Sequence, residues 1–145
     1  MKFNVRWGYN NVQMAEGDKW KAIFRTNCDL FEPLVMFFGL INSPMTFLTM
    51  MNLLFKKLID CGVVVIYIDN VMIFTKILEE YRHVVKEVLQ ILQDEHLYLY
   101  HDKCDFEVQE TEFLRLIVAQ DQVKMDHKKV SAIKDWPIPT FKKQL

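Results

Sequence analysis

The stretch that most constrains the fold is residues 63–74, where two runs of β-branched and aromatic residues flank Asp69-Asn70. Val, Ile, Tyr and Phe favour extended strands, whereas Asp and Asn favour turns. The stretch therefore predicts a buried β-hairpin that presents a polar pair at its tip. On these residues alone, an ordinary turn between two core strands is the favoured interpretation, and only the rest of the chain can indicate a function for the tip.

The composition is that of a folded domain. Hydrophobic residues make up 51% of the 145, and only 4 Gly and 4 Pro interrupt them, which excludes a disordered chain and fits one domain. No apolar run approaches the roughly 18–20 residues of a membrane helix, so no membrane association is expected. The 3 cysteines are odd in number and form no CxxC pair. They predict reduced thiols and an intracellular location, with no disulfide frame or zinc site.

The charge is unevenly distributed although the net charge is only −1. Residues 76–112 hold 4 basic and 10 acidic side chains, and residues 113–145 hold 7 basic and 3 acidic ones. The second stretch is the only plausible phosphate-contacting patch. An ordinary solvated surface is the alternative interpretation.

The periodicity predicts an α+β fold, an antiparallel sheet with helices on one face. Ser43 and Pro44 are expected to cap and begin a helix that Gly62 closes. The expected strands are 9–14 and 20–26 as one hairpin, 97–100, 106–108, and 112–118 paired with 123–125; further helices are expected over 78–92 and 127–135.

Residue patterns alone do not assemble a catalytic site. There is no Gly-rich phosphate loop, HExxH motif or Ser/His/Asp arrangement, and the 4 His residues are scattered. Trp7, Tyr9 and Tyr67 could stack on bases, or they could belong to the core.

Longer motifs are more specific. They comprise residues 2–11, 16–21, 24–26, 35–44, 67–70 and 103–106, and a tail from 125 to 140. In this order and spacing they resemble the reverse transcriptase domain of gypsy-type LTR retrotransposons. The resemblance implies a polymerase palm with part of the fingers, in which 12–36 is a fingers-like hairpin region and 119–145 begins the thumb or connection. It also implies an RNA/DNA template-primer as partner, and the remaining fingers, connection and RNase H regions of a polyprotein are missing.

The resemblance further implies a two-metal site, in which three aspartates hold two Mg²⁺ ions about 3.5–4 Å apart. The corresponding positions are Asn4, Asp69 and Asn70, so only Asp69 keeps a carboxylate. An amide is a neutral ligand, and hard Mg²⁺ prefers anionic oxygen. The expectation is therefore weak Mg²⁺ binding by Asp69 and impaired or absent nucleotidyl transfer.

Other site residues follow from the same resemblance. Lys103 corresponds to the lysine that protonates pyrophosphate, and Tyr9 to the gate that excludes a ribose 2′-hydroxyl. The nucleotide- and template-binding positions are Tyr9, Phe38, Gly39, Pro44 and Tyr67, and the primer-gripping turn is Phe113, Leu114 and Arg115. Arg115 replaces a glycine there and is expected to be strained if that position needs a positive φ.

Three hypotheses follow. The first is a truncated, degenerate reverse transcriptase fragment of a retrotransposon polyprotein without useful catalysis. The second is a co-opted nucleic-acid-binding or protein-interaction module that keeps the palm fold. The third is a polymerase that stays active despite Asn4.

Overall fold

The computed structural model describes residues 1–136, and the chain divides into two compact units, Met1–Phe106 and Glu107–Leu145. Each unit is described by itself. The last part of the predicted thumb or connection segment, residues 137–145, lies outside the described residues. The assignments of 12–36 to fingers and of 119–145 to thumb or connection remain predictions.

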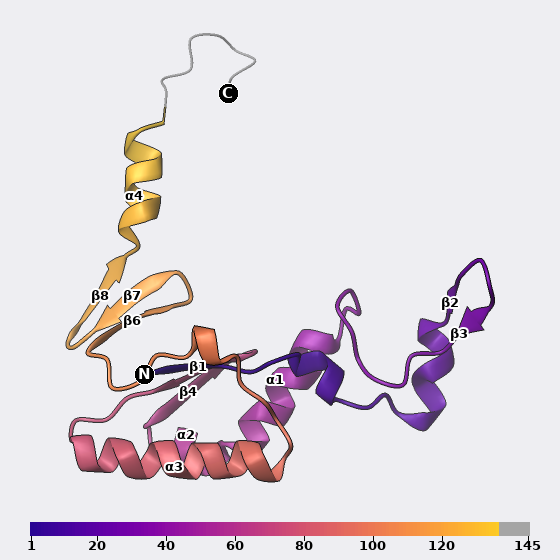
Figure 1. Ribbon diagram of the computed structural model, residues 1–145, viewed down its shortest axis with the longest axis horizontal. Helices are drawn as coiled ribbons and strands as arrows, with labels where there is room; N and C mark the ends of the chain where they lie inside the picture. The colour runs from indigo at the N-terminus through magenta and orange to yellow at the C-terminus, as the bar shows by residue number, and fades with distance from the viewer. Residues whose placement is uncertain (137–145) are drawn as a thin grey trace. The chain divides into compact units, whose positions relative to one another are not determined.

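The first unit is built on a three-stranded antiparallel sheet (Figure 1). Its strands are β1 (Lys2–Asn4), β4 (Val64–Tyr67) and β5 (Asn70–Ile73), in the order β1-β5-β4. The hairpin predicted over residues 63–74 is confirmed. The turn residues are Ile68 and Asp69, because Asn70 already pairs with Tyr67 across the hairpin.

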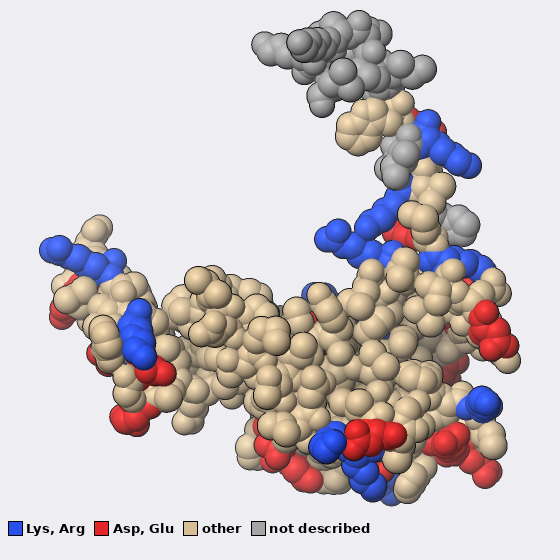
Figure 2. Space-filling view, turned by 180° about the vertical axis from the view of Figure 1, so that it is seen from behind, with Lys and Arg blue, Asp and Glu red and all other residues tan. Residues whose placement is uncertain are grey.

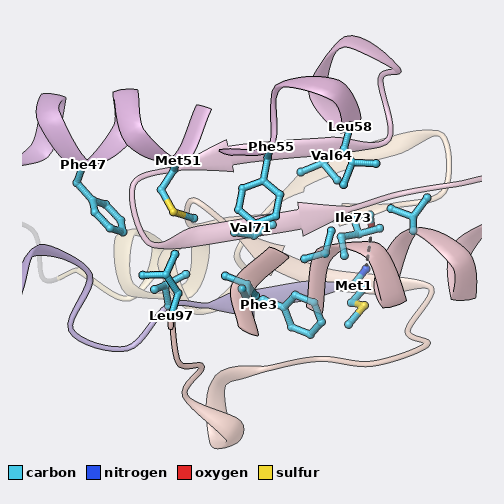
Figure 3. Packing of buried hydrophobic residues seen from close by; sticks show 14 of the residues in the cluster. Met1, Phe3, Phe47, Met51, Phe55, Leu58, Val64, Val71, Ile73 and Leu97 are labelled. Atoms are coloured by element: carbon cyan, nitrogen blue, oxygen red, sulfur yellow. Dashed lines mark hydrogen bonds between the residues drawn. The ribbon is translucent and has the colours of Figure 1, made fainter. Parts of the chain in front are cut away.

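Three helices of the first unit contribute side chains to the same hydrophobic core as the sheet does. They are α1 (Ser43–Leu54), α2 (Lys56–Asp60) and α3 (Leu78–Asp94), and α3 runs along the sheet in Figure 1. Phe3 and Val71 of the sheet and Phe47 of α1 are fully buried in one cluster (Figure 3). Val88 of α3 is fully buried in the same cluster. Each such side chain contributes roughly 1.5–3 kcal/mol by leaving water. The predicted α+β arrangement, with helices packed on one face, is confirmed.

The helix predicted from Ser43 to Gly62 is broken once, at Phe55, whose ring is fully buried. Ser43 is also not the N-cap: Asn42 holds that position, and the Ser43 hydroxyl donates to the carbonyl oxygen of Phe37 at 3.2 Å. Gly62 closes α2 with a φ of 71°, as predicted. The break lets Phe55 turn into the core between two shorter helices.

The hairpin predicted from strands 9–14 and 20–26 is wrong. Residues 8–11 and 16–22 form the 3₁₀ helices η1 (Gly8–Asn11) and η2 (Glu16–Ala22). In η2, Lys19 and Lys21 pair with carboxylates three residues earlier, which a turn allows and a strand does not. The extended part near residue 13 pairs with Val35 instead, and only the short β2 (Phe24–Arg25) and β3 (Leu30–Phe31) form a hairpin.

The strands predicted near residues 97–100 and 106–108 are reduced or absent. Leu99 makes a single bridge with Val5, and residues 106–108 form no strand. Between them lies the 3₁₀ helix η3 (His101–Lys103). Isolated backbone hydrogen bonds join this segment to residues 2–6, and they do not form the continuous ladder of a regular strand.

The second unit is a three-stranded antiparallel sheet followed by a helix. Its strands are β6 (Glu110–Phe113), β7 (Leu116–Ala119) and β8 (Gln122–Met125), and α4 spans His127–Lys134. The single strand predicted over 112–118 is wrong, because a tight turn at Leu114 and Arg115 divides it, with φ of 52° and 65°. The pairing of 116–118 with 123–125 is confirmed.

Candidate active site

The hairpin tip and β1 bring Asn4, Asp69 and Asn70 into one hydrogen-bonded cluster. The Nδ2 of Asn4 donates to Asp69 Oδ2 at 3.0 Å and lies 3.3 Å from Asn70 Oδ1. The Nδ2 of Asn70 donates to the other oxygen, Asp69 Oδ1, at 2.9 Å. The structure thus assembles all three residues that the resemblance assigned to the catalytic centre.

Backbone pairing places these side chains. Asn4 and Asn70 are direct partners in the β1–β5 register, and the N–H of Val5 donates to the carbonyl oxygen of Asp69 at 2.7 Å. Ile68 precedes Asp69 with a φ of 54°, a left-handed conformation that is strained for a β-branched residue. A strained turn held from both sides fixes the direction in which Asp69 presents its carboxylate.

The cluster does not fit a pair of Mg²⁺ ions. Both oxygens of Asp69 already accept amide N–H groups, and the two neighbours add no charge. Among the residues whose side chains the structure describes, no three His, Cys, Asp or Glu side chains lie together where they could hold a metal. One carboxylate with two amides offers much weaker attraction for a hard cation than three carboxylates do.

The predicted nucleotide pocket residues partly converge. The Tyr9 ring lies 4.9 Å from that of Phe38 and 5.7 Å from that of Phe47, centroid to centroid. Burial, and secondly the negative charge of Asp69, raise the pKa of the Tyr9 hydroxyl. Tyr9 is therefore close enough to the cluster to sense its one remaining charge.

The remaining predicted positions lie at the ends of elements. Gly39 has a φ of 106° in the loop before α1, and Pro44 is in the first turn of that helix. Tyr67 ends β4, is half exposed and pairs with Asn70. Lys103 ends η3 and lies over the ring of Tyr100.

The turn predicted to grip a primer belongs to the second unit. Phe113 is buried there, and Leu114 and Arg115 form the turn itself. Both have positive φ, so the expectation that Arg115 occupies a glycine-like conformation is confirmed. Its role in gripping a primer remains a prediction.

Two residues beside the cluster were missed, Arg6 and Tyr100. The guanidinium of Arg6 lies 4.4 Å from the Trp7 ring centroid and 5.9 Å from that of Tyr100. Arg6 lies in the turn that follows β1, so strand periodicity gave no signal for it.

Residues 1–118 match the family described as Reverse transcriptase (RNA-dependent DNA polymerase). The chain belongs to the reverse transcriptase family.

Curated relatives of this reverse transcriptase chain are retrotransposon polyproteins. It is 37% identical over 138 residues to the retrovirus-related Pol polyprotein from transposon 297 of Drosophila melanogaster, covering 95% of this chain and 13% of the relative. It is 27% identical over 144 residues to the transposon Tf2-7 polyprotein of Schizosaccharomyces pombe, covering 99% of this chain and 11% of the relative. The chain thus spans only a small part of these polyproteins.

Solved structures support the same fold. The foamy viral protease-reverse transcriptase in complex with RNA/DNA hybrid superposes with a TM-score of 0.85 at 17% identity, covering 95% of this chain and 18% of that one. A form of the same enzyme in complex with double-stranded DNA gives a TM-score of 0.87 at 17% identity, covering 99% and 25%. The predicted polymerase palm is confirmed as the fold. In the described residues, no helix is long and apolar enough to cross a membrane.

Proposed function

We propose that this chain is a reverse transcriptase palm that keeps a template-primer surface and has lost nucleotidyl transfer. The observation that carries the proposal is the Asn4–Asp69–Asn70 cluster, in which amide donors satisfy both oxygens of the only carboxylate. The family generally uses Mg²⁺, and here a metal would have to displace two hydrogen bonds to reach one charge. Weak or absent Mg²⁺ binding follows.

The chemistry also requires the missing charges. Two metal ions activate the attacking hydroxyl and stabilise the leaving group in phosphoryl transfer. A single carboxylate cannot hold two dications side by side, because it neutralises only a quarter of their four positive charges. The cluster therefore stabilises the hairpin tip, and it does not provide the two metal ions that nucleotidyl transfer requires.

Two observations support retained nucleic-acid binding. Figure 2 shows Lys and Arg side chains gathered over the segment that follows β8, where Lys129 and Lys134 are exposed. The structurally similar foamy viral enzyme was captured with an RNA/DNA hybrid. We therefore assign the RNA/DNA template-primer as the partner class, with phosphate contacts that weaken as salt rises.

The test has a metal arm and an activity arm. Mn²⁺, a spectroscopic substitute for Mg²⁺, is titrated into the wild-type chain and into the Asn4→Asp/Asn70→Asp variant. The wild type is expected to bind at least about tenfold more weakly, which corresponds to roughly 1.4 kcal/mol. Asn52→Asp, on the exposed side of α1, is the matched control for added charge.

The activity arm uses a primer on an RNA template with Mg²⁺ and deoxynucleoside triphosphates. No extension by the wild-type chain is expected. Extension by the wild type that Asp69→Ala abolishes would overturn the proposal, because it would show that the cluster still assembles working metals.

A further inference from the structure

The hairpin of β2 and β3 forms a small sheet of its own. Within the described residues it has two strands, and the side chains of both are exposed (Figure 1). Its turn is well fixed, because the N–H of Thr26 donates to the carbonyl oxygen of Asp29 at 2.9 Å and the N–H of Asp29 donates to the Thr26 hydroxyl at 3.2 Å. An isolated two-stranded hairpin is only marginally stable in water, and further strands stabilise it.

The two edges of this hairpin differ. Residue pairs in an antiparallel ladder alternate between hydrogen-bonded and non-hydrogen-bonded ones. Because Thr26 bonds to Asp29, the next pair, Arg25 and Leu30, is non-bonded, and its N–H and C=O groups point away from the hairpin. On β3 the outward N–H of Leu30 donates to the Asp29 carboxylate at 2.8 Å. Among the described residues the N–H of Arg25 has no such side-chain partner, so the open edge is that of β2.

One face of the hairpin carries stacked aromatic rings. Phe24 and Phe31 are direct partners across the strands, with ring centroids 5.9 Å apart and an angle of 24° between the ring planes. Their side chains are 51% and 46% exposed. Phe24 belongs to the open edge, so a further aromatic ring placed beside it would extend the stack and remove apolar surface from water.

A second copy of β2 supplies both the backbone groups and the ring. In an antiparallel pair of β2 strands related by a two-fold axis, Arg25 of one copy can lie opposite Arg25 or Ile23 of the other. Arg25 opposite Arg25 sets like charges against each other, which is destabilising. The pairing of Arg25 with Ile23 avoids this repulsion, and it sets Phe24 opposite Phe24 at the axis.

The backbone is suited to this register. Ile23 has a φ of −55° and a ψ of 136°, so the chain is already extended before β2 begins. The N–H of Ile23 donates weakly to Trp20 at 3.4 Å, which leaves the carbonyl oxygen of Ile23 to accept the N–H of Arg25 from the other copy. Phe24 then forms a non-hydrogen-bonded pair with its counterpart, the arrangement in which opposing side chains lie closest.

We propose that two copies of this chain associate through β2, which makes a four-stranded sheet in the order β3-β2-β2-β3 with Phe24 and Phe31 of both copies stacked on one face. The inference goes beyond the proposed function and does not depend on the amide cluster. Because few residues of each copy take part, the contact is smaller than the roughly 800 Å² per partner of a standard interface. The association is therefore weak and depends on concentration.

Sedimentation of the full chain over a concentration series tests the backbone pairing, with Arg25→Ala and Arg25→Pro as matched variants. Both remove the guanidinium, and only proline removes the outward N–H, which the hairpin itself does not use. The wild type and Arg25→Ala should pass from monomer to dimer as concentration rises. Arg25→Pro should raise the dissociation constant of the dimer at least about tenfold. Circular dichroism checks that each variant is folded.

The ring contact has its own pair of variants. Phe24→Ala should raise the dissociation constant of the dimer about tenfold, because it removes the ring at the two-fold axis. Leu30→Ala is the matched control, since Leu30 is 61% exposed, lies on β3 and points to the opposite face. Equal weakening by the two variants would show nonspecific apolar association and would overturn the proposal.

Disulfide formation tests the register, in a Cys28→Ser/Cys61→Ser background that removes the exposed thiols. A non-hydrogen-bonded pair brings Cα atoms to about 4.5 Å, within the range of about 4.4–6.8 Å that a disulfide spans. Phe24→Cys should therefore give more linked dimer under mild oxidation than Arg25→Cys does, and the reverse result would contradict the pairing. A wild-type chain that stays monomeric up to its solubility limit, or a dimer that Arg25→Pro leaves unchanged, would refute the inference.

Discussion

Asn4 and Asn70 face each other across β1 and β5, with the Nδ2 of Asn4 3.3 Å from the Oδ1 of Asn70. Each amide also donates to a different oxygen of Asp69. The three side chains satisfy one another, so the tip of the hairpin holds its shape without a cation. The effect of replacing one of these asparagines by aspartate can therefore be predicted.

Asn4→Asp alone should destabilise the chain near neutral pH. It replaces an amide donor 3.0 Å from Asp69 by a second carboxylate, at a position that is only 8% exposed. The loss should be about 1–3 kcal/mol, from one broken charged hydrogen bond and the new repulsion. Repulsion raises the folded-state pKa of the new pair above that of the unfolded chain, so the loss should shrink as pH falls and protonates one acid.

Thermal or urea unfolding at several pH values, with and without Mg²⁺, measures this loss. Asn52→Asp on the exposed side of α1 controls for adding an acid anywhere. A variant as stable as the wild type at pH 7 without metal would show that the cluster is not held by these hydrogen bonds.

Gly8→Ala should destabilise the first unit by about 1–3 kcal/mol through overpacking. A Cβ at Gly8 would lie 2.7 Å from the ring of Phe47, which is fully buried and has no room to withdraw. Gly17→Ala is the matched control, because a Cβ there meets nothing within 4 Å and Gly17 has no positive φ. Equal midpoints for the two variants in urea would contradict the packing at η1.

Arg115→Gly should stabilise the β6–β7 turn by about 1 kcal/mol. Arg115 has a φ of 65°, and a left-handed conformation costs an L-residue roughly 1–2 kcal/mol. Glycine relieves this strain, but it also gains more conformational freedom in the unfolded chain, which cancels part of the stabilisation. Hydrogen exchange of the β6 and β7 amides measures the local effect. Arg115→Ala removes the same side chain and keeps the strain, so protection should rise only in the glycine variant.

The hydroxyl of Tyr9 should lose its proton at a higher pH than the hydroxyl of an ordinary tyrosine does. Burial and the charge of Asp69 raise its pKa in the folded chain, so the folded state keeps the proton to higher pH than the unfolded state does. The contribution of Tyr9 to the free energy of unfolding is therefore present below the pKa of the unfolded chain, about 10, and is lost as pH rises through the pKa of Tyr9 in the folded chain. Ultraviolet absorbance of tyrosinate follows the titration, and Tyr9→Phe identifies the late step.

Asp69→Asn tests the second cause of that shift. Removing the carboxylate should move the Tyr9 titration toward lower pH without abolishing the shift, because burial is the larger cause. An unchanged curve would mean that Tyr9 does not sense the cluster.

The sequence by itself determined the elements whose signals are local. The hairpin over 63–74 follows from its β-branched runs, and α3 follows from apolar residues repeated at helical spacing. The closing of α2 at Gly62 also follows from residue type and position, whereas the glycine-like conformation of Arg115 was expected from the family resemblance. The resemblance added which residues meet at the tip, and the structure does bring Asn4, Asp69 and Asn70 together.

Only the tertiary structure decided what depends on contacts between distant parts of the chain. The alternation over 9–14 and 20–26 resembles a strand pattern, yet the segment near residue 13 pairs with Val35 and the rest folds into 3₁₀ turns. The bond from Asn4 to Asp69 spans 65 residues, and its donor direction depends on the β1–β5 register. Arg6 and Lys103 meet on Tyr100 only because η3 lies along β1. Propensity and periodicity act over a few residues, whereas these geometries are set by packing and backbone pairing across the whole unit.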